Sequence, residues 1–553
     1  MKFHKDKRGA VYVDSVVKII ISLLVGAVVL AICTGLIAEV VLPTTNSKIQ
    51  TMFNTEPGRL ANISGGGPNS LGNAFDDGVC HLKYYLTLED AIADANIGST
   101  EHENATEESA GARIDIRQKD GVMIVRPLAD CEVTQSIDLS GDYTLDLNGK
   151  NITINTSGVQ FNLTEGATIT LRDSYSTDIE DPEASTGSIT KTTASASGSA
   201  TETIFDSETG SAALVVLNGK YSATDTNAGA VMAFYAENSS AVDIKSAKVE
   251  VNTASGAAQG VCVVRADYFN LVQSKVVCSS TNVGGLAVWA DGTKDIMIDN
   301  SIIQVRGKTL KTTYGMCVEN GGFVVVQNST VYGYANTLQC DDKAYVNDCT
   351  FSGGHSGLQT TGTGTVYING GIFESCMHGG VYLAAQNNIV SNAHMYLRNF
   401  QDLQSYDFTR VTWGDNFHPS YAAGTKMGGS YIGNDKNIAT YAYFDNCTFS
   451  GINPANKYSI VVSSNYNYKN TYLYLSNSAL EGRVRVDGKN VGNGACGHFY
   501  KGKNVTMGAD VFFITSANAS ASTYTDEPGV YDDTTYADTA FTQQEVEKMI
   551  SSR

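Results

Sequence analysis

The sequence predicts an all-β chain in which short strands coil and stack on one another, preceded by one N-terminal transmembrane α-helix. Two observations carry this prediction: a turn motif that recurs at drifting intervals along most of the chain, and one uncharged run long enough to span a bilayer. The composition agrees, because 29 Tyr with abundant Val, Ile and Thr favour strands and a hydrophobic content of 42% argues against wholesale disorder.

The N-terminus predicts where the protein resides. Four basic residues lie within the first eight positions, and the uncharged run 19–38 follows them. At about 1.5 Å per residue this run is roughly 30 Å long as a helix, which is the thickness of a bilayer core. Positive charge before the run favours a cytoplasmic N-terminus. We therefore expect a basic leader over residues 1–14, a single-pass anchor in the cell membrane over 15–42, and an extracellular location for the bulk of the chain. A cleavable signal is the alternative, although its apolar region is usually only about 7–15 residues long.

Two smaller features lie in this N-terminal segment. Ala27, Ala31 and Gly35 are four residues apart on one helix face, which would allow self-association in lipid; the alternative is a lone anchor. Lys7-Arg8-Gly9 before the apolar helix resembles the leader of type IV pilin-like proteins, which implies cleavage after Gly9. That family has Glu at the fifth mature position, where this chain has Asp14.

The repeated motif consists of an apolar residue, two polar residues that often include Asn, and a small residue. It begins at Ile298, Val326, Val346, Ile368, Phe444 and Leu475, with looser copies at Ile244 and Val272. The drifting interval excludes helical repeats of constant period, whereas a coil of strands can lengthen its turns. Asn and Gly fit the bends because both tolerate left-handed backbone angles, and stacked Asn side chains can bond to one another.

A second motif lies between copies of the first, at Gly260-Val-Cys-Val263, Gly285-Leu-Ala-Val288 and Gly315-Met-Cys-Val318, so each rung has at least two strands. Together with Leu145-Asp-Leu-Asn-Gly-Lys150, this organisation resembles the right-handed parallel β-helix of the pectate-lyase-like superfamily. The resemblance implies the architecture and leaves the activity open.

The chain then divides into further parts. Residues 43–80 have the composition of a linker, and Thr87 with Asp90 predicts a capped helix. Glu545, three residues after Thr542, forms a second capping box near the C-terminus. We expect a stalk over 43–80, a capping helix and lead-in over 81–110, a β-helix over 111–525 with insertions near 178–209 and 401–439, and a tail with a capping helix over 526–553.

All cysteines except Cys33 lie outside the predicted membrane span. Cys262 and Cys317 align with Ala287 in the second motif, and Cys349 and Cys447 align with Ser or Gly in the first. Packing therefore explains them, and we expect buried thiols in an inner column; disulfides are the alternative in an exported chain.

The candidate catalytic residues are Asp341, Asp342, His355 and His378. Each histidine precedes a Gly by two residues, which predicts that the two stack about 4.8 Å apart on successive rungs. Paired carboxylates near a histidine suit hydrolysis of a glycosidic bond. The pattern resembles the Asp-Asp and Gly-His elements of polygalacturonases; the structural alternative is exposed turn residues and a histidine ladder.

The candidate ligand contacts are aromatic side chains that offer flat faces to pyranose rings: Trp413, Phe417, Tyr466 and Tyr468. No residue spacing marks a metal site, and Ca²⁺, which a pectate-type lyase would need, is the one cofactor considered. Nucleic acid is excluded as a partner, because the net charge is −19 and phosphate binding needs Lys and Arg.

These observations leave three hypotheses for the function. We expect a membrane-anchored surface protein that acts as an adhesin or glycan-binding structural protein, with a glycan or a host or partner-cell surface as its partner. The first alternative is a surface-tethered polysaccharide lyase or pectinase-like glycoside hydrolase. The second is a minor pilin-like subunit.

Overall fold

The computed structural model describes residues 82–97, 105–106, 111–119, 122–207, 210–239, 241–280, 284–307, 313–376, 378–398, 429–433, 438–452, 457–463, 469–487 and 497–514. The chain divides into two compact units, and every described residue belongs to the second, residues 67–552. The predicted leader, anchor, stalk and C-terminal helix lie outside the described residues. Within the described ranges, no helix is both long enough and apolar enough to cross a membrane.

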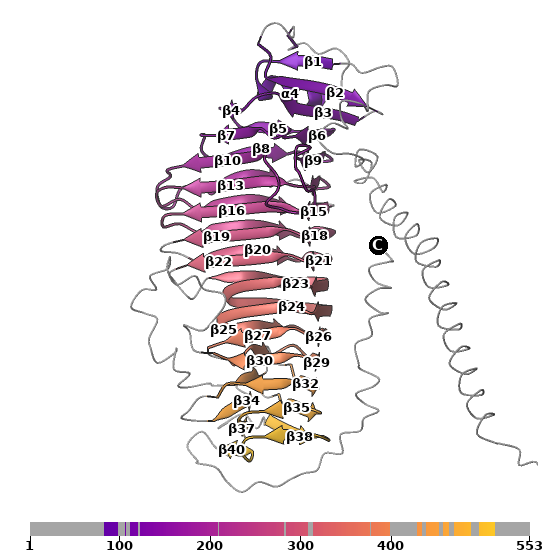
Figure 1. Cartoon of the computed structure of the whole chain (residues 1–553), viewed down its shortest axis with the longest axis vertical. Coiled ribbons are helices and arrows are strands. Elements are labelled where there is room, and N and C mark those ends of the chain that lie inside the picture. Colours follow the sequence, from indigo (N-terminus) through magenta and orange to yellow (C-terminus); the bar gives the residue numbers. More distant parts are fainter. Residues whose placement is uncertain are drawn as a thin grey trace, which may run out of the picture. The chain divides into compact units, whose positions relative to one another are not determined.

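The described chain is all-β apart from one helix, and its strands form successive coils (Figure 1). Most strands pair in parallel with the strand three places later, as do β4 (Cys131–Val133) with β7 (Asn151–Ile154), β5 (Ile137–Leu139) with β8 (Val159–Leu163), and β6 (Asp142–Asp146) with β9 (Thr168–Arg172). The coil therefore has three faces, named face 1, face 2 and face 3 after these three pairs. The predicted coil of parallel strands is confirmed, and its right hand stays a prediction.

The remaining strands extend the three faces. Face 1 continues with β10 (Ser188–Thr193), β13 (Gly219–Asp225), β16 (Ala247–Thr253), β19 (Lys275–Ser280), β22 (Ile302–Gly307), β27 (Ile372–Ser375), β30 (His394–Leu397), β33 (Thr448–Ser450), β36 (Ala479–Leu480) and β39 (Thr506–Met507). Face 2 continues with β11 (Glu202–Ser207), β14 (Val231–Glu237), β17 (Ala258–Val264), β20 (Gly285–Asp291), β28 (Val381–Leu383), β31 (Ser430–Ile432), β34 (Tyr458–Val462), β37 (Arg483–Asp487) and β40 (Phe512–Ile514). Face 3 continues with β12 (Ala213–Val216), β15 (Ala241–Lys245), β18 (Tyr268–Val272), β21 (Asp295–Asp299), β26 (Thr365–Asn369), β29 (Asn387–Ser391), β32 (Thr440–Asp445), β35 (Thr471–Ser476) and β38 (Gly497–Lys501). Three long strands bend around corners and serve more than one face: β23 (Tyr314–Gln327), β24 (Thr330–Asn347) and β25 (Thr350–Thr361).

An N-terminal cap closes the first coil. It contains the antiparallel strands β1 (Leu82–Tyr85), β2 (Ile114–Lys119) and β3 (Val122–Pro127), and the helix α4 (Leu88–Ile97), whose apolar face is buried. The Thr87 hydroxyl accepts a hydrogen bond from the Asp90 amide at 3.2 Å, as the predicted helix cap requires. The cap covers a strand edge that would otherwise be open to pairing with another chain.

The corner between face 3 and face 1 is the recurring turn motif. In most coils its third residue has a positive φ near 50°, as at Asn300, Asn328 and Asn446. Stacked Asn side chains bond between coils, since Asn446 Nδ2 donates to Asn392 Oδ1 at 2.8 Å. The prediction of left-handed turns joined by an Asn ladder is confirmed.

The small residue that follows the left-handed position points into the coil. The Ser274 amide donates to Ser301 Oγ, and the Ser301 amide donates to Ser329 Oγ, both at 3.1 Å. Cys349 and Cys447 occupy the same column and are buried. The turn motif thus supplies a buried column of hydroxyl and thiol groups that satisfies main-chain donors at this corner.

All eight cysteines in the described part of the chain are buried, so the burial of these side chains is confirmed, but the inner column does not hold all of them. The alignment of two of them was wrong. In the strand register Cys262 and Cys317 each lie beside Trp289, and not beside Ala287. Their column faces outward from face 2, so these two thiols are not part of an inner column.

The first insertion was predicted too long. The range 178–209 includes β10 and β11, which are ordinary coil strands, and the excursion itself spans residues 173–187. Its Glu183 forms ion pairs with Lys248 at 2.9 Å and Lys275 at 2.7 Å, both on face 1. In β10 the inward residues Ile189, Lys191 and Thr193 alternate with outward ones, so a strand forms where the Ser- and Thr-rich composition had suggested a loop. Most of the second predicted insertion, 401–439, lies outside the described residues, and β31 is within it.

Candidate functional site

One column of side chains on the outside of face 2 crosses several coils. Parallel strands in register place one residue of each coil about 4.8 Å from the next. The column consists of Cys262, Trp289, Cys317, Thr337, Gln359, Tyr382 and Tyr431. We call it the face-2 column.

A local break in the strand alternation decides which side chains reach this column. In β20, Leu286 and Trp289 are partly exposed, while Ala287 and Val288 between them are both fully buried. Because these two consecutive side chains both point inward, the inward and outward positions after Val288 are shifted by one residue relative to those before Ala287. Tyr314 and Cys317 repeat this arrangement one coil later, so that aromatic side chains from two coils lie on the same outer surface.

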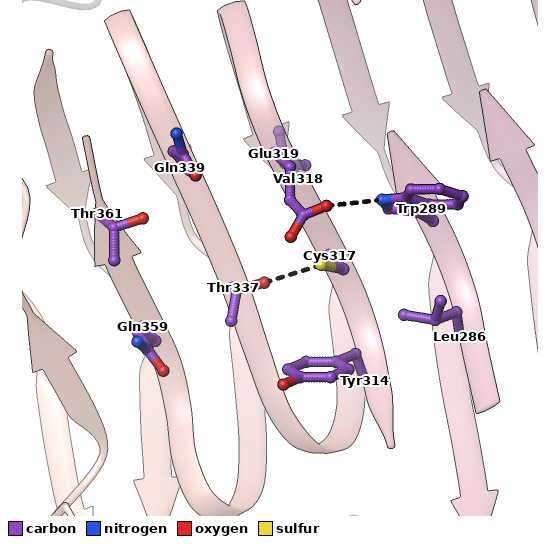
Figure 2. A pocket seen from close by; sticks show the side chains of 10 residues that line it. All are labelled: Leu286, Trp289, Tyr314, Cys317, Val318, Glu319, Thr337, Gln339, Gln359 and Thr361. Carbon is purple, nitrogen blue, oxygen red and sulfur yellow. Dashed lines mark hydrogen bonds between the residues drawn. The ribbon is translucent and has the colours of Figure 1, made fainter. Parts of the chain in front are cut away.

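These side chains surround an open groove of about 430 Å³ (Figure 2). The volume is within the range of small-ligand sites, about 300–1,000 Å³. Two aromatic rings lie among hydroxyl, amide and carboxylate groups, and the lining residues are Leu286, Trp289, Tyr314, Cys317, Val318, Glu319, Thr337, Gln339, Gln359 and Thr361. We call this site the face-2 groove.

Hydrogen bonds hold the polar groups of the groove in place. Trp289 Nε1 donates to Glu319 Oε2 at 3.2 Å, which fixes the carboxylate beside the indole ring (Figure 2). Thr337 Oγ1 donates to Cys317 Sγ at 3.1 Å. At the edge of the groove Gln339 Nε2 donates to Asn320 Oδ1 at 3.0 Å. The groove is therefore preorganised.

The Cys317 thiol faces the groove, but its acidity argues against a nucleophilic role. The pKa of Cys317 is raised to about 11, mainly by burial. The hydrogen bond from Thr337 lowers this pKa, and the nearby carboxylates of Glu319 and Asp291 raise it. The thiolate is the nucleophilic form of cysteine. At neutral pH the Cys317 side chain is a small neutral group in the wall of the groove.

The two predicted histidines do stack on successive coils. His355 Nε2 and His378 Nε2 are 3.2 Å apart, and the ring centroids are 4.4 Å apart. Burial lowers the pKa of His355 to about 4, and burial together with the neighbouring His355 lowers the pKa of His378 well below its usual value. Tyr382 and Tyr431 of the face-2 column pack on His378. Both rings are therefore neutral at physiological pH and part of an aromatic cluster.

The structure does not bring the histidines and the predicted carboxylates together. His355 lies at one end of the face-2 part of β24 and β25, next to the register pair Ala335 and Ser356. Asp341 and Asp342 lie at the other end, after the register pair Gln339 and Thr361. At about 3.3 Å per residue the two groups are roughly 15–20 Å apart. Asp341 and Asp342 are exposed at that corner.

The other candidates lie outside the described residues: Trp413, Phe417, Tyr466, Tyr468, Gly9, Asp14, Ala27, Ala31 and Gly35. Sequence reasoning missed Trp289, Tyr314 and Glu319. The recurrence of the second motif was the available signal, since Trp289 follows one of its copies by a single residue. Within the described ranges, no group of three or more His, Cys, Asp or Glu is placed to hold a metal ion.

Comparison with known proteins gives one match. A family model described as a family of unknown function (DUF6133) matches residues 2–56, which include the predicted leader and anchor and none of the described coil. The search of curated proteins found no match to this chain, and neither did the search of solved structures. The face-2 groove must therefore be interpreted from its own chemistry.

Proposed function

We propose that this protein is a membrane-anchored surface protein whose right-handed β-helix presents face 2 as a glycan-binding surface. The uncharged run 19–38 supports the anchor. The stacked parallel strands support a rigid display scaffold, because each coil fixes the side chains of the next.

The observation that carries the proposal is the combination of residues in the face-2 groove. Trp289 and Tyr314 supply flat apolar faces, and Glu319, Gln339 and Gln359 supply hydrogen-bonding groups around them. A pyranose ring has one apolar face and a rim of hydroxyl groups, and such a lining complements both. The lining residues come from β20, β23, β24 and β25, which lie on successive coils, and a site of this extent suits a chain of sugars.

Binding without chemistry is better supported than hydrolysis. The carboxylates at Asp341 and Asp342 are separated from the histidines by the length of a face-2 strand, so these four predicted residues do not act together on one bond. The Nε2 atoms of the two histidines face each other. No observation in the described chain favours the lyase or the pilin-like alternative.

A glycan array with the full-length chain tests the proposal, followed by Trp289→Ala. Removal of a central aromatic anchor is expected to weaken binding at least about tenfold, as for a binding hot spot. Tyr175→Ala is the matched control, because Tyr175 is 53% exposed in the excursion between β9 and β10. Equal affinity of both variants for the captured glycan would place binding elsewhere and refute the proposal.

A further inference from the structure

The face-2 groove carries charge of one sign. Among the residues that line it Glu319 is charged, and no Lys or Arg is present. Asp291 lies beside Glu319 in the register one coil earlier. The exposed Asp341 and Asp342 follow Gln339 at the end of the groove. The nearest strands thus add negative charge to a chain whose net charge is already −19.

Two basic residues near the groove, Arg265 and Lys294, already have acidic partners, and Lys343 follows Asp342 at the start of the face-3 part of β24. Arg265 forms an ion pair with Glu237 and also donates to Asn238 Oδ1 at 3.0 Å. Lys294 pairs with Asp267 at 2.5 Å. An anionic ligand in the groove would therefore meet uncompensated carboxylates, which disfavours its approach and its binding.

The position of Glu319 suits a cation. Its Oε2 accepts the indole N–H of Trp289, so the carboxylate is held at the edge of an aromatic ring. Its Oε1 accepts no hydrogen bond from the described residues and lies on the groove side in Figure 2. An ammonium group placed there would gain a charge-assisted hydrogen bond to the carboxylate.

We propose that the face-2 groove selects glycans that carry free amino groups, such as glucosamine-type sugars, over neutral glycans, and rejects uronic acids. This inference rests on the glycan binding proposed above and names its substrate class. It reverses the expectation that resemblance to pectin-degrading proteins would give, since pectins are polyanions.

A sugar fits the groove better than a basic peptide does. The strands β20, β23 and β24 beneath it are paired on both sides, so they have no free edge to which an extended peptide could add. Recognition must use side chains alone, and the aromatic faces and amide groups then select a ring with hydroxyl groups.

The experiment measures the affinity of the full-length chain for four tetramers of equal length: glucosamine, N-acetylglucosamine, galacturonate and lysine. The sequence has two Trp, so Trp413→Phe leaves Trp289 as the single indole reporter of binding at this site. We expect the glucosamine tetramer to bind about two- to fivefold more tightly than its acetylated form, from one exposed ion pair. Galacturonate should bind most weakly, and added salt should reduce the preference for the amine.

Two variants locate the source of the preference. Glu319→Gln should abolish this preference, so that the glucosamine and N-acetylglucosamine tetramers bind the variant with equal affinity. Glu165→Gln removes the same charge at an exposed turn and should have no effect. The inference is overturned if galacturonate or tetralysine binds as tightly as the glucosamine tetramer, or if Glu319→Gln keeps the preference. In each of those cases the proposed glycan binding is still supported if at least one sugar tetramer changes the Trp289 signal. If none of the three sugars does, both the inference and the proposed function fail.

Discussion

At the scale of single residues, the structure buries several ionisable groups that make the fold sensitive to pH and to substitution. The His355 and His378 pair is one, and the Lys191 and Glu202 pair is another. His355 and His378 are on successive coils, whereas Lys191 in β10 and Glu202 at the start of β11 belong to one coil. The contributions of the two pairs to stability have opposite chemical origins, because the histidines are stable as neutral rings and the Lys–Glu pair as ions.

The histidine pair predicts a loss of stability in weak acid. The pKa of His355 is about 4 in the folded chain, against about 6.5 for an unperturbed histidine. The unfolded chain therefore binds protons that the folded chain does not. The stabilisation is complete above pH 6.5 and is lost as the pH falls toward 4, by about 2 to 3 kcal/mol.

Urea unfolding at several pH values between 7 and 4 measures this loss. The wild type and His355→Gln should converge in stability as the pH falls, because the variant lacks the titrating ring. His394→Gln is the control, since His394 is exposed on face 1. If the difference between wild type and His355→Gln stayed constant with pH, the burial argument would be incorrect.

The Lys191 side chain points into the coil, where it is 1% exposed. Its ammonium group is 3.3 Å from the Glu202 carboxylate, which is 3% exposed. Lys191→Ala would leave the buried carboxylate without its counter-ion, with hydrogen bonds only from the Gly158 amide and the Ser195 hydroxyl, at a cost of about 3–5 kcal/mol. The double variant Lys191→Met with Glu202→Gln should recover part of this loss. A double-mutant cycle in urea measures the coupling, and an additive result would contradict the proposed dependence of each ion on the other.

At the scale of elements, the inner Ser column is the feature that joins one coil to the next at the turn motif. Ser301 Oγ accepts the Ser274 amide and donates to the Asp299 carbonyl at 2.8 Å. Ser301→Ala would orphan a buried amide donor and should destabilise the protein by about 1–3 kcal/mol.

A matched variant separates the lost hydrogen bond from packing. Cys349 and Cys447 already occupy this column, so Ser301→Cys is expected to cost less than Ser301→Ala. Thermal unfolding of both variants gives the comparison. An alanine variant as stable as the wild type would show that the hydroxyl contributes nothing.

The same elements explain what sequence reasoning could and could not predict. The turn motif was predictable because a left-handed position restricts the local choice of residue, as at Asn300 and Asn328. The groove was not, because Ala287 and Val288 both point inward and shift the strand alternation. Trp289 joins Cys317 only through register between coils, which no single segment of sequence encodes.

At the scale of the whole coil, each strand is stabilised by the coils before and after it, so the ends need separate protection. The helix α4 protects the first coil by packing on β2, β3, β4 and β5. Its Leu88, Ala91 and Ile92 are fully buried against them. The cap therefore blocks pairing of the first coil with another molecule, in addition to adding buried surface.

This role of the cap predicts self-association when it is displaced. Ile92→Asp places a charge in the buried face of α4 and should release the helix from the first coil, because an unpaired buried charge is strongly unfavourable. The exposed strand edges of that coil would then pair between molecules, as unprotected edges do. Light scattering at increasing protein concentration should detect oligomers that the wild type lacks.

Ile97→Asp is the matched control, since Ile97 is on the same helix and is 71% exposed. It makes the same chemical change without disturbing the packing of the cap, so it should scatter light like the wild type. Far-UV circular dichroism should still show a β spectrum for Ile92→Asp, because coils distant from the cap keep their neighbours. A variant that lost all β structure at once would mean that the coil folds as one cooperative unit with its cap, and the cap would then be a folding nucleus and not a barrier to association.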